Sequence, residues 1–165
     1  MNIIDYKKSF TNSLRQATLC FLIKGDQVFL AMKKRGFAVG KFNGIGGKKN
    51  DDETIENATI RETQEEIDVV VTDLRKMANL KCYFPDNSEW GQQVNVFLVS
   101  EWSGEPVETE EMNPQWFNKK DIPFERMWPD EKLWLPLVLE GKSVEAEFVF
   151  DKNESIIDQA LKVLP

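Results

Sequence analysis

The chain contains no histidine, and this absence excludes more chemistry than any other feature of its composition. Without histidine there is no Ser-His or Cys-His nucleophile pair, no imidazole general base and no imidazole metal ligand. Only two cysteines occur, Cys20 and Cys82, and they lie far apart without the spacing of a metal site. We expect both thiols to be reduced and to pack as small apolar side chains. Acid–base or metal chemistry must therefore rest on carboxylates.

Long apolar runs are also missing. No stretch approaches the roughly 20 residues that a membrane-spanning helix needs. The first residues, MNIIDYKKSFTNSLRQ, are mixed and polar, without a signal-peptide pattern. We therefore expect a soluble, cytoplasmic protein that does not bind membranes. The length of 165 residues and the hydrophobic content of 41% suit one globular domain over residues 16–165, preceded by an N-terminal extension over residues 1–15.

Positive charge is scarce overall. The formal net charge of −7 argues against a broad basic face that would bind polymeric nucleic acid. Residues 27–50 are the exception, because they contain no acidic residue and six basic ones: Lys33, Lys34, Arg35, Lys41, Lys48 and Lys49. Lysines can simply protect a sheet edge. The same segment can instead supply local cations for a small anionic ligand.

Hydrophobic patterns predict a mixed α/β fold in which helices sandwich the strands. Residues 16–24 and 27–34 are apolar strands joined by Gly25-Asp26 as a hairpin. Residues 33–49, rich in glycine, predict a loop with one short strand. The remaining expected elements are a helix capped by Asp51 or Asp52 and ending near Ile67, strands near 69–84, 92–102, 115–117 and 148–150, and helices over 129–139 and 154–164.

Three glutamates crowd the first of these helices: Glu62, Glu65 and Glu66. At roughly 100° per residue, Ile60, Thr63 and Ile67 form a stripe that can pack on the sheet, and the three acids share the adjoining face. Like charges at this spacing destabilise a helix by a few tenths of a kcal/mol each. A hard divalent cation such as Mg²⁺ or Mn²⁺ would reverse that sign. A solvated acidic face is the plainer alternative.

The spacing of charged residues around these glutamates resembles the Nudix box, G-x5-E-x7-R-E-U-x-E-E-x-G-U, in which U is a bulky aliphatic residue. The matching positions are Gly47, Glu53, Arg61, Glu62, Glu65 and Glu66. Thr63 departs from the pattern by replacing an aliphatic residue, and Asp68 departs by replacing the second glycine, where the helix should end. Because aspartate tolerates left-handed backbone better than most residues, we expect a cost of about 1 kcal/mol and no loss of function.

This resemblance implies a Nudix hydrolase, with an α/β/α sandwich built on a mixed, largely antiparallel-flanked sheet. Such enzymes use Mg²⁺, for which Mn²⁺ is a possible substitute, to hydrolyse nucleoside diphosphates linked to another group. The catalytic residues that it implies are Glu53, Arg61, Glu62, Glu65 and Glu66. The implied metal ligands are the Gly46 carbonyl, Glu62, Glu65 and Glu66, with Glu111 as an additional metal-linked carboxylate.

Further stretches carry the resemblance over nearly the whole chain after Gln16: MKKRGFAVGKFNGIGGKK, VETEEMNPQWF, IPFERMWPDEKLWLPLVLEGK and DQALK. They are similar to family members that hydrolyse oxidised purine nucleoside triphosphates, such as 8-oxo-dGTP and 2-hydroxy-dATP, to the monophosphate and pyrophosphate. The substrate-binding positions implied are Thr18, Lys33, Phe37, Asn43, Gly47, Lys48, Phe84, Trp128, Asp130 and Glu131. The stretch WPDE is also an ordinary helix start, with proline at the first position and acids near the dipole.

The chemistry of oxidised purines fits these positions. Oxidation at C8 turns guanine N7 from an acceptor into an N–H donor, which favours acceptors such as Asp130 and Glu131. Two carboxyls so close titrate as a pair, and a carboxyl that keeps its proton can donate to O6. Glu131 replaces an aspartate of the similar family members, and Cys82 replaces a pocket aromatic. These changes affect the ranking of substrates more than the type of reaction.

Two alternatives stay open. Within the family, the substrate could be a dinucleoside polyphosphate or an RNA 5′ end. The alternative to an enzyme is a non-catalytic module that binds nucleotides, although such a module has no need of three mutually repelling glutamates. The acidic charge disfavours long RNA but not short 5′ ends. For the main hypothesis we expect a monomer whose partner is a small nucleotide, not polymeric nucleic acid.

Overall fold

The structure is a computed structural model that describes residues 3–10, 13–36 and 38–165. The helices are α1 (Ile3–Ser9), α2 (Ile55–Ile67) and α3 (Glu131–Leu139), with short 3-10 turns at η1 (Ser88–Trp90) and η2 (Phe124–Arg126). The strands are β1 (Arg15–Lys24), β2 (Gln27–Lys33), β3 (Phe42–Asn43), β4 (Ile45–Lys48), β5 (Val70–Thr72), β6 (Arg75–Tyr83), β7 (Gln92–Val99), β8 (Glu101–Ser103), β9 (Met112–Asn118), β10 (Val144–Phe150) and β11 (Ile156–Val163).

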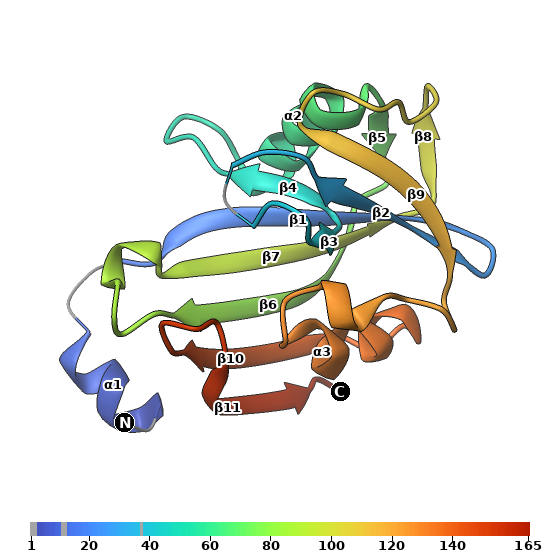
Figure 1. The fold of residues 1–165 in the computed structure, drawn as a ribbon. Coiled ribbons are helices and arrows are strands. Elements are labelled where there is room, and N and C mark those ends of the chain that lie inside the picture. The colour runs from blue at the N-terminus through green and yellow to red at the C-terminus, as the bar shows by residue number, and fades with distance from the viewer. Residues whose placement is uncertain (1–2, 11–12, 37) are drawn as a thin grey trace.

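Most strands belong to one mixed sheet, whose order is β11-β10-β6-β7-β1-β2-β3 (Figure 1). Strand β4 pairs with β1, and β9 pairs with β2. The β1–β7 and β6–β10 pairs are parallel, and the other pairs are antiparallel. Strands β5 and β8 form a separate antiparallel ribbon. The predicted mixed α/β class is therefore confirmed.

Side-chain alternation along β1 divides the core into two layers. Leu19 and Phe21 pack in the cluster that contains Trp134 of α3. Cys20 and Leu22 pack in the cluster that contains Ile67 of α2. Because successive strand residues point to opposite faces, the sheet carries α2 on one side and α3 on the other (Figure 1). This arrangement is the sandwich expected from the sequence.

The hairpin turn and the end of the glutamate-bearing helix were predicted correctly. The β1–β2 hairpin turns at Gly25, which has φ 60°, and pairs Lys24 with Gln27. Helix α2 ends at Asp68, whose left-handed φ of 59° matches the expected tolerance of aspartate for that geometry. The start of the helix was predicted wrongly, because the cap is Thr54 and not Asp51 or Asp52. The Thr54 hydroxyl accepts a hydrogen bond from the Asn57 backbone N–H at 3.1 Å.

The C-terminal helix predicted over 154–164 is wrong, because residues 156–163 form strand β11 along the free edge of β10. Several strands differ in extent from the prediction. The glycine-rich segment contains two short strands, β3 and β4, and 69–84 and 92–102 each divide into two strands. Strands β9 and β10 are longer than expected. Pairing with neighbours, which local composition does not encode, sets these lengths.

The residues before the predicted domain contain helix α1. Its Ile3 and Tyr6 side chains are buried, and they cluster with Tyr83 and Val149 of the sheet. Cys20 and Cys82 are unpaired and buried, as expected. Within the described ranges, no helix has the length and apolarity needed to cross a bilayer. The assignment of residues 16–165 to a single domain stays a prediction.

Candidate active site

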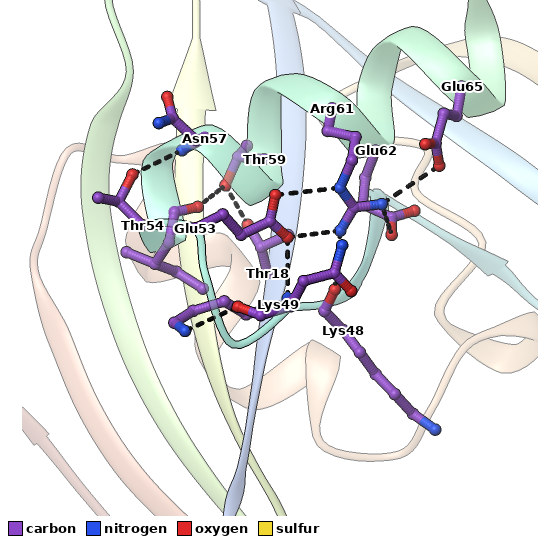
Figure 2. A network of polar contacts seen from close by, with 12 residues as sticks. Thr18, Lys48, Lys49, Glu53, Thr54, Asn57, Thr59, Arg61, Glu62 and Glu65 are labelled. Atoms are coloured by element: carbon purple, nitrogen blue, oxygen red, sulfur yellow. Dashed lines mark hydrogen bonds and ion pairs between the residues drawn. The ribbon is translucent and has the colours of Figure 1, made fainter.

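Arg61 joins helix α2 to the loop that precedes it (Figure 2). Its guanidinium donates to both carboxylate oxygens of Glu53, from Nε to Oε2 at 3.1 Å and from Nη2 to Oε1 at 2.7 Å. Nη2 also donates to the carbonyl oxygen of Lys48 at 3.0 Å, and Glu53 accepts from the Asn50 N–H at 2.8 Å. The hydrogen bond from Arg61 is the main cause that lowers the pKa of Glu53 to about 2. The loop and helix are therefore joined through a charge-assisted, two-pronged contact.

The same guanidinium contacts two of the three crowded glutamates. Nη1 of Arg61 lies 2.9 Å from Glu62 Oε1 and 3.3 Å from Glu65 Oε2 (Figure 2). The Glu62 side chain is 14% exposed, whereas that of Glu65 is 59% exposed. Burial raises the pKa of Glu62, although the hydrogen bond from Arg61 opposes this shift. Arg61 thus neutralises part of the charge that the sequence places on this face.

Glu66 occupies the most buried position of the three. It is 8% exposed, and its Oε2 atom has no hydrogen-bond partner within the described part of the chain. Burial raises its pKa to about 8, and the negative charge of Glu62 adds to the effect. The charge of Lys33 and a hydrogen bond with the Gly46 backbone act in the opposite direction. Such a carboxylate is costly unless a proton or a cation accompanies it.

Two glycines allow β4 to lie between β1 and α2. Gly46 pairs with Leu19 and Gly47 with Thr18. A Cβ atom at Gly46 would clash with the carbonyl oxygen of Thr18. A Cβ atom at Gly47 would lie 2.5 Å from the carboxyl carbon of Glu62. The absence of side chains here brings the β4 backbone against the carboxylates of α2.

A cavity of about 530 Å³ opens beside β4, between the sheet and α3. It brings together nine of the ten residues expected to bind substrate: Thr18, Lys33, Asn43, Gly47, Lys48, Phe84, Trp128, Asp130 and Glu131. The tenth, Phe37, lies outside the described residues. Gly46 lines the cavity too, so its wall touches the strand that borders the glutamates.

One part of this cavity, which we term the Asp130–Glu131 pocket, is lined by those two acids with Cys82, Phe84 and Trp128. Asp130 is 6% exposed and Glu131 is 1% exposed. Burial raises the pKa of both carboxyls, and the charge of Asp130 raises that of Glu131 further. Burial, followed by the charges of both acids, also keeps the Cys82 thiol protonated by raising its pKa well above the usual value. The pocket therefore holds carboxyls that favour the neutral form.

The pocket contains one hydrogen bond that the sequence did not predict. Trp134 is buried in the core, and its Nε1–H donates to Asp130 Oδ2 at 2.8 Å. The i,i+4 spacing of these residues at the start of α3 was the available signal. By contrast, Glu131 Oε2 has no partner within the described residues. The two acids therefore differ, since one accepts from an indole and the other presents an open oxygen.

Glu111 lies at the end of the segment before β9 and, unlike the buried carboxylates, is about half exposed. Its oxygen is 3.4 Å from Nη2 of Arg35, and both side chains are about half exposed or more. Its charge nevertheless contributes to the raised pKa of Glu66. Among residues 3–10, 13–36 and 38–165, no three His, Cys, Asp or Glu side chains converge closely enough to hold a metal ion as they stand. Arg61, which contacts Glu62 and Glu65, occupies two of the expected carboxylates instead.

This fold and this helix-borne group of glutamates are those of the Nudix family. Residues 13–138 match the family model described as NUDIX domain, and the chain belongs to that family. Two curated relatives are named "Oxidized purine nucleoside triphosphate hydrolase". The Danio rerio protein is 42% identical over 152 residues, covering 92% of this chain and 96% of that protein. The Mus musculus protein is 38% identical over 148 residues, covering 90% and 94% respectively.

A solved structure supports the fold. The crystal structure of a MutT protein from Bacillus halodurans superposes with a TM-score of 0.81 at 22% identity, covering 90% of this chain and 98% of that one. The Nudix sandwich expected from the sequence resemblance is therefore confirmed.

Proposed function

We propose that this chain hydrolyses oxidised purine nucleoside triphosphates to the monophosphate and pyrophosphate, and so removes damaged precursors from the nucleotide pool. The observation that carries the proposal is the cavity, which is lined by β4, the strand that lies against Glu62, and by the buried acids Asp130 and Glu131. The names of the Danio rerio and Mus musculus relatives support it, since both proteins match this chain over nine-tenths of its length.

We propose Mg²⁺ as the cofactor, held by Glu62, Glu65, Glu66 and the Gly46 carbonyl, with Glu111 nearby. The residues fit a hard cation, because all of these donors are oxygens and Glu66 Oε2 is buried without a hydrogen-bond partner in the described chain. Glu65 must exchange its contact with Arg61 to take part. Bound Mg²⁺ supplies charge neutralisation for the phosphates and lowers the pKa of a coordinated water.

The chain's own cations suit the triphosphate. Lys33, at the end of β2, and Lys48, at the end of β4, both line the cavity. Phosphoryl transfer needs charge neutralisation and alignment more than covalent catalysis. Arg61 keeps Glu62 oriented, and Glu53 keeps Arg61 in place. These roles need no histidine.

The Asp130–Glu131 pocket suits the oxidised base. A deprotonated carboxylate there accepts the N7–H that oxidation creates, while a carboxyl that keeps its proton donates to O6. Trp128 offers a flat surface for stacking and lies edge-on to Phe84, with ring centroids 6.3 Å apart. The amide of Asn43 adds a donor and an acceptor at the same cavity. We expect the enzyme to act as a cytoplasmic monomer.

The test is Mg²⁺-dependent hydrolysis of 8-oxo-dGTP, 2-hydroxy-dATP, dGTP and a dinucleoside polyphosphate, with the products separated. We expect the oxidised purines to have the highest kcat/KM and to yield monophosphate plus pyrophosphate. Glu66→Gln should abolish turnover, whereas Glu56→Gln, at an exposed and variable position of the motif on the same helix, should not.

Other outcomes would redirect the proposal. Equal rates for dGTP and the oxidised purines would refute the substrate while leaving the Nudix reaction intact. Preference for the dinucleoside polyphosphate would favour the alternative within the family. Nucleotide binding without any Mg²⁺-dependent turnover would favour a binding module instead of an enzyme.

A further inference from the structure

Lys41 lies where three segments distant in sequence meet at the rim of the Asp130–Glu131 pocket. The chain holds its backbone on both sides, since Lys41 N donates to the Ala38 carbonyl at 3.1 Å and Lys33 N donates to the Lys41 carbonyl at 3.0 Å. The Lys41 side chain lines the same cavity as Trp128 and Glu131. Nothing in the sequence motifs singled out this lysine among the six basic residues of its segment.

Two contacts fix the Lys41 ammonium. Its Nζ lies 5.3 Å from the centroid of the Trp128 ring, within cation–π range. Nζ also lies 3.7 Å from Oε1 of Glu154, in the turn between β10 and β11. Glu154 takes a left-handed φ of 65° there, and its N–H donates to the Asp151 carbonyl at 3.0 Å. Glu154, in the turn between β10 and β11, therefore helps to hold the lysine over the Trp128 ring of the pocket.

The charge of Lys41 also reaches the buried acids. The titratable groups that interact with Glu131 are Asp130 beside it, Cys82 on β6 and Lys41. Of these, Lys41 alone brings positive charge, and it opposes the effect of burial on Glu131. The Trp134 indole donates to Asp130 but carries no charge. The ammonium of Lys41 therefore favours the ionised form of Glu131.

We propose that Lys41 is a positioning residue for the base: its ammonium, held between the Trp128 ring and Glu154, fixes the stacking surface and places a positive charge at the rim of the Asp130–Glu131 pocket when a purine binds. The inference rests on the proposed function, because it assumes that the base occupies this pocket. It adds a residue that acts through its neighbours and that lies outside the Nudix motif.

Binding of the product 8-oxo-dGMP tests the idea without turnover. Isothermal titration in EDTA from pH 5.5 to 8.5, in two buffers of different ionisation enthalpy, gives both affinity and proton uptake. Lys41→Met should weaken binding about two- to fivefold through the loss of the cation–π contact. It should also move the pH of tightest binding upward by about half a unit, because the pair then holds its protons more strongly.

Matched variants separate charge from packing. Lys41→Arg should retain the wild-type pH optimum, and Lys24→Met, at the exposed end of β1, should change nothing despite the same loss of charge. Glu154→Gln should move the optimum in the opposite direction, downward, because it removes a negative charge that partly cancels Lys41. Circular dichroism and thermal unfolding check that each variant is folded.

The outcomes are distinct. Weaker binding by Lys41→Met with an unchanged pH optimum overturns the electrostatic role, and an unchanged affinity and optimum overturn the inference entirely. A wild-type protein that binds dGMP as tightly as 8-oxo-dGMP shows instead that the proposed function fails at this pocket. An upward shift for Lys41→Met together with a downward shift for Glu154→Gln supports the proposal.

Discussion

The buried carboxylate of Glu66 makes the metal-free protein less stable at neutral pH than in mild acid. Its pKa is raised from 4.5 to about 8. Stability from such a group is fully present below pH 4.5, where both folded and unfolded states are protonated, and is lost as the pH rises toward 8. By pH 7 Glu66 is ionised in the unfolded chain but still largely protonated in the folded one. Each pKa unit corresponds to about 1.4 kcal/mol, so the folded state loses about 3 kcal/mol of stability relative to mild acid.

Glu66→Gln removes this ionisation while keeping the shape of the side chain. We expect the metal-free variant to be more stable than wild type by about 1 to 3 kcal/mol at pH 7, because the amide still needs hydrogen-bond partners in a buried site. At pH 4.5 most of that advantage should disappear. Urea unfolding in EDTA at both pH values measures the difference.

Two comparisons make the result decisive. Glu65→Gln, at a side chain that is 59% exposed, should change the free energy of unfolding little at either pH. Mg²⁺ should stabilise the wild type but not Glu66→Gln, since a cation that binds only the folded state raises its stability. If Glu66→Gln is no more stable than wild type at pH 7, or gains equally at pH 4.5, the electrostatic account of Glu66 is wrong.

Two other substitutions test the geometry that supports the glutamates. Gly47→Ala places a Cβ 2.5 Å from the carboxyl carbon of Glu62. We therefore expect kcat to fall at least tenfold while the midpoint of thermal unfolding changes by only a few degrees. An unchanged kcat would show that Glu62 can move freely. Arg61→Lys cannot keep both hydrogen bonds to Glu53, so we expect a tenfold or greater loss of kcat/KM, and near-normal activity would show that one ammonium contact suffices.

Local signals decided which parts of the fold the sequence could predict. The Gly25-Asp26 turn and the glutamate-bearing helix depend on residues close together in the chain, and both were predicted. The C-terminal strand was mistaken for a helix because its apolar residues fit helical spacing. In the structure Ile157, Leu161 and Val163 are 37–46% exposed. Their helix-like spacing therefore does not correspond to a buried side of a helix. Pairing with the free edge of β10 makes residues 156–163 a strand.

The candidate site divides in the same way. Motif spacing placed Glu62, Glu65 and Glu66 on one helical face, because helix geometry converts spacing into direction. It did not reveal how deeply Glu66 is buried, since that depends on how α2 sits over β4. The position of Lys41 over Trp128 was equally hidden, because only the folded sheet brings those segments together.

Two groups of buried carboxylates occur within the described residues, and their surroundings predict different responses to pH. Glu66 interacts electrostatically with Glu62 and Lys33. The exposed Glu65 can join Glu62 and Glu66 as a metal ligand, so a cation competes with a proton for these carboxylates. The Asp130–Glu131 pair is more enclosed, and a retained proton is the available neutraliser.

The profile of kcat/KM against pH should therefore be bell-shaped, with an acid limb from the metal-binding glutamates and an alkaline limb from the pair losing its proton. Higher Mg²⁺ concentration should move the acid limb to lower pH and leave the alkaline limb in place, because only the first group exchanges protons for a cation. Steady-state rates with 8-oxo-dGTP at two Mg²⁺ concentrations measure both limbs. If the alkaline limb moves with Mg²⁺, the two carboxylate groups are not the independent sites that their separate surroundings imply.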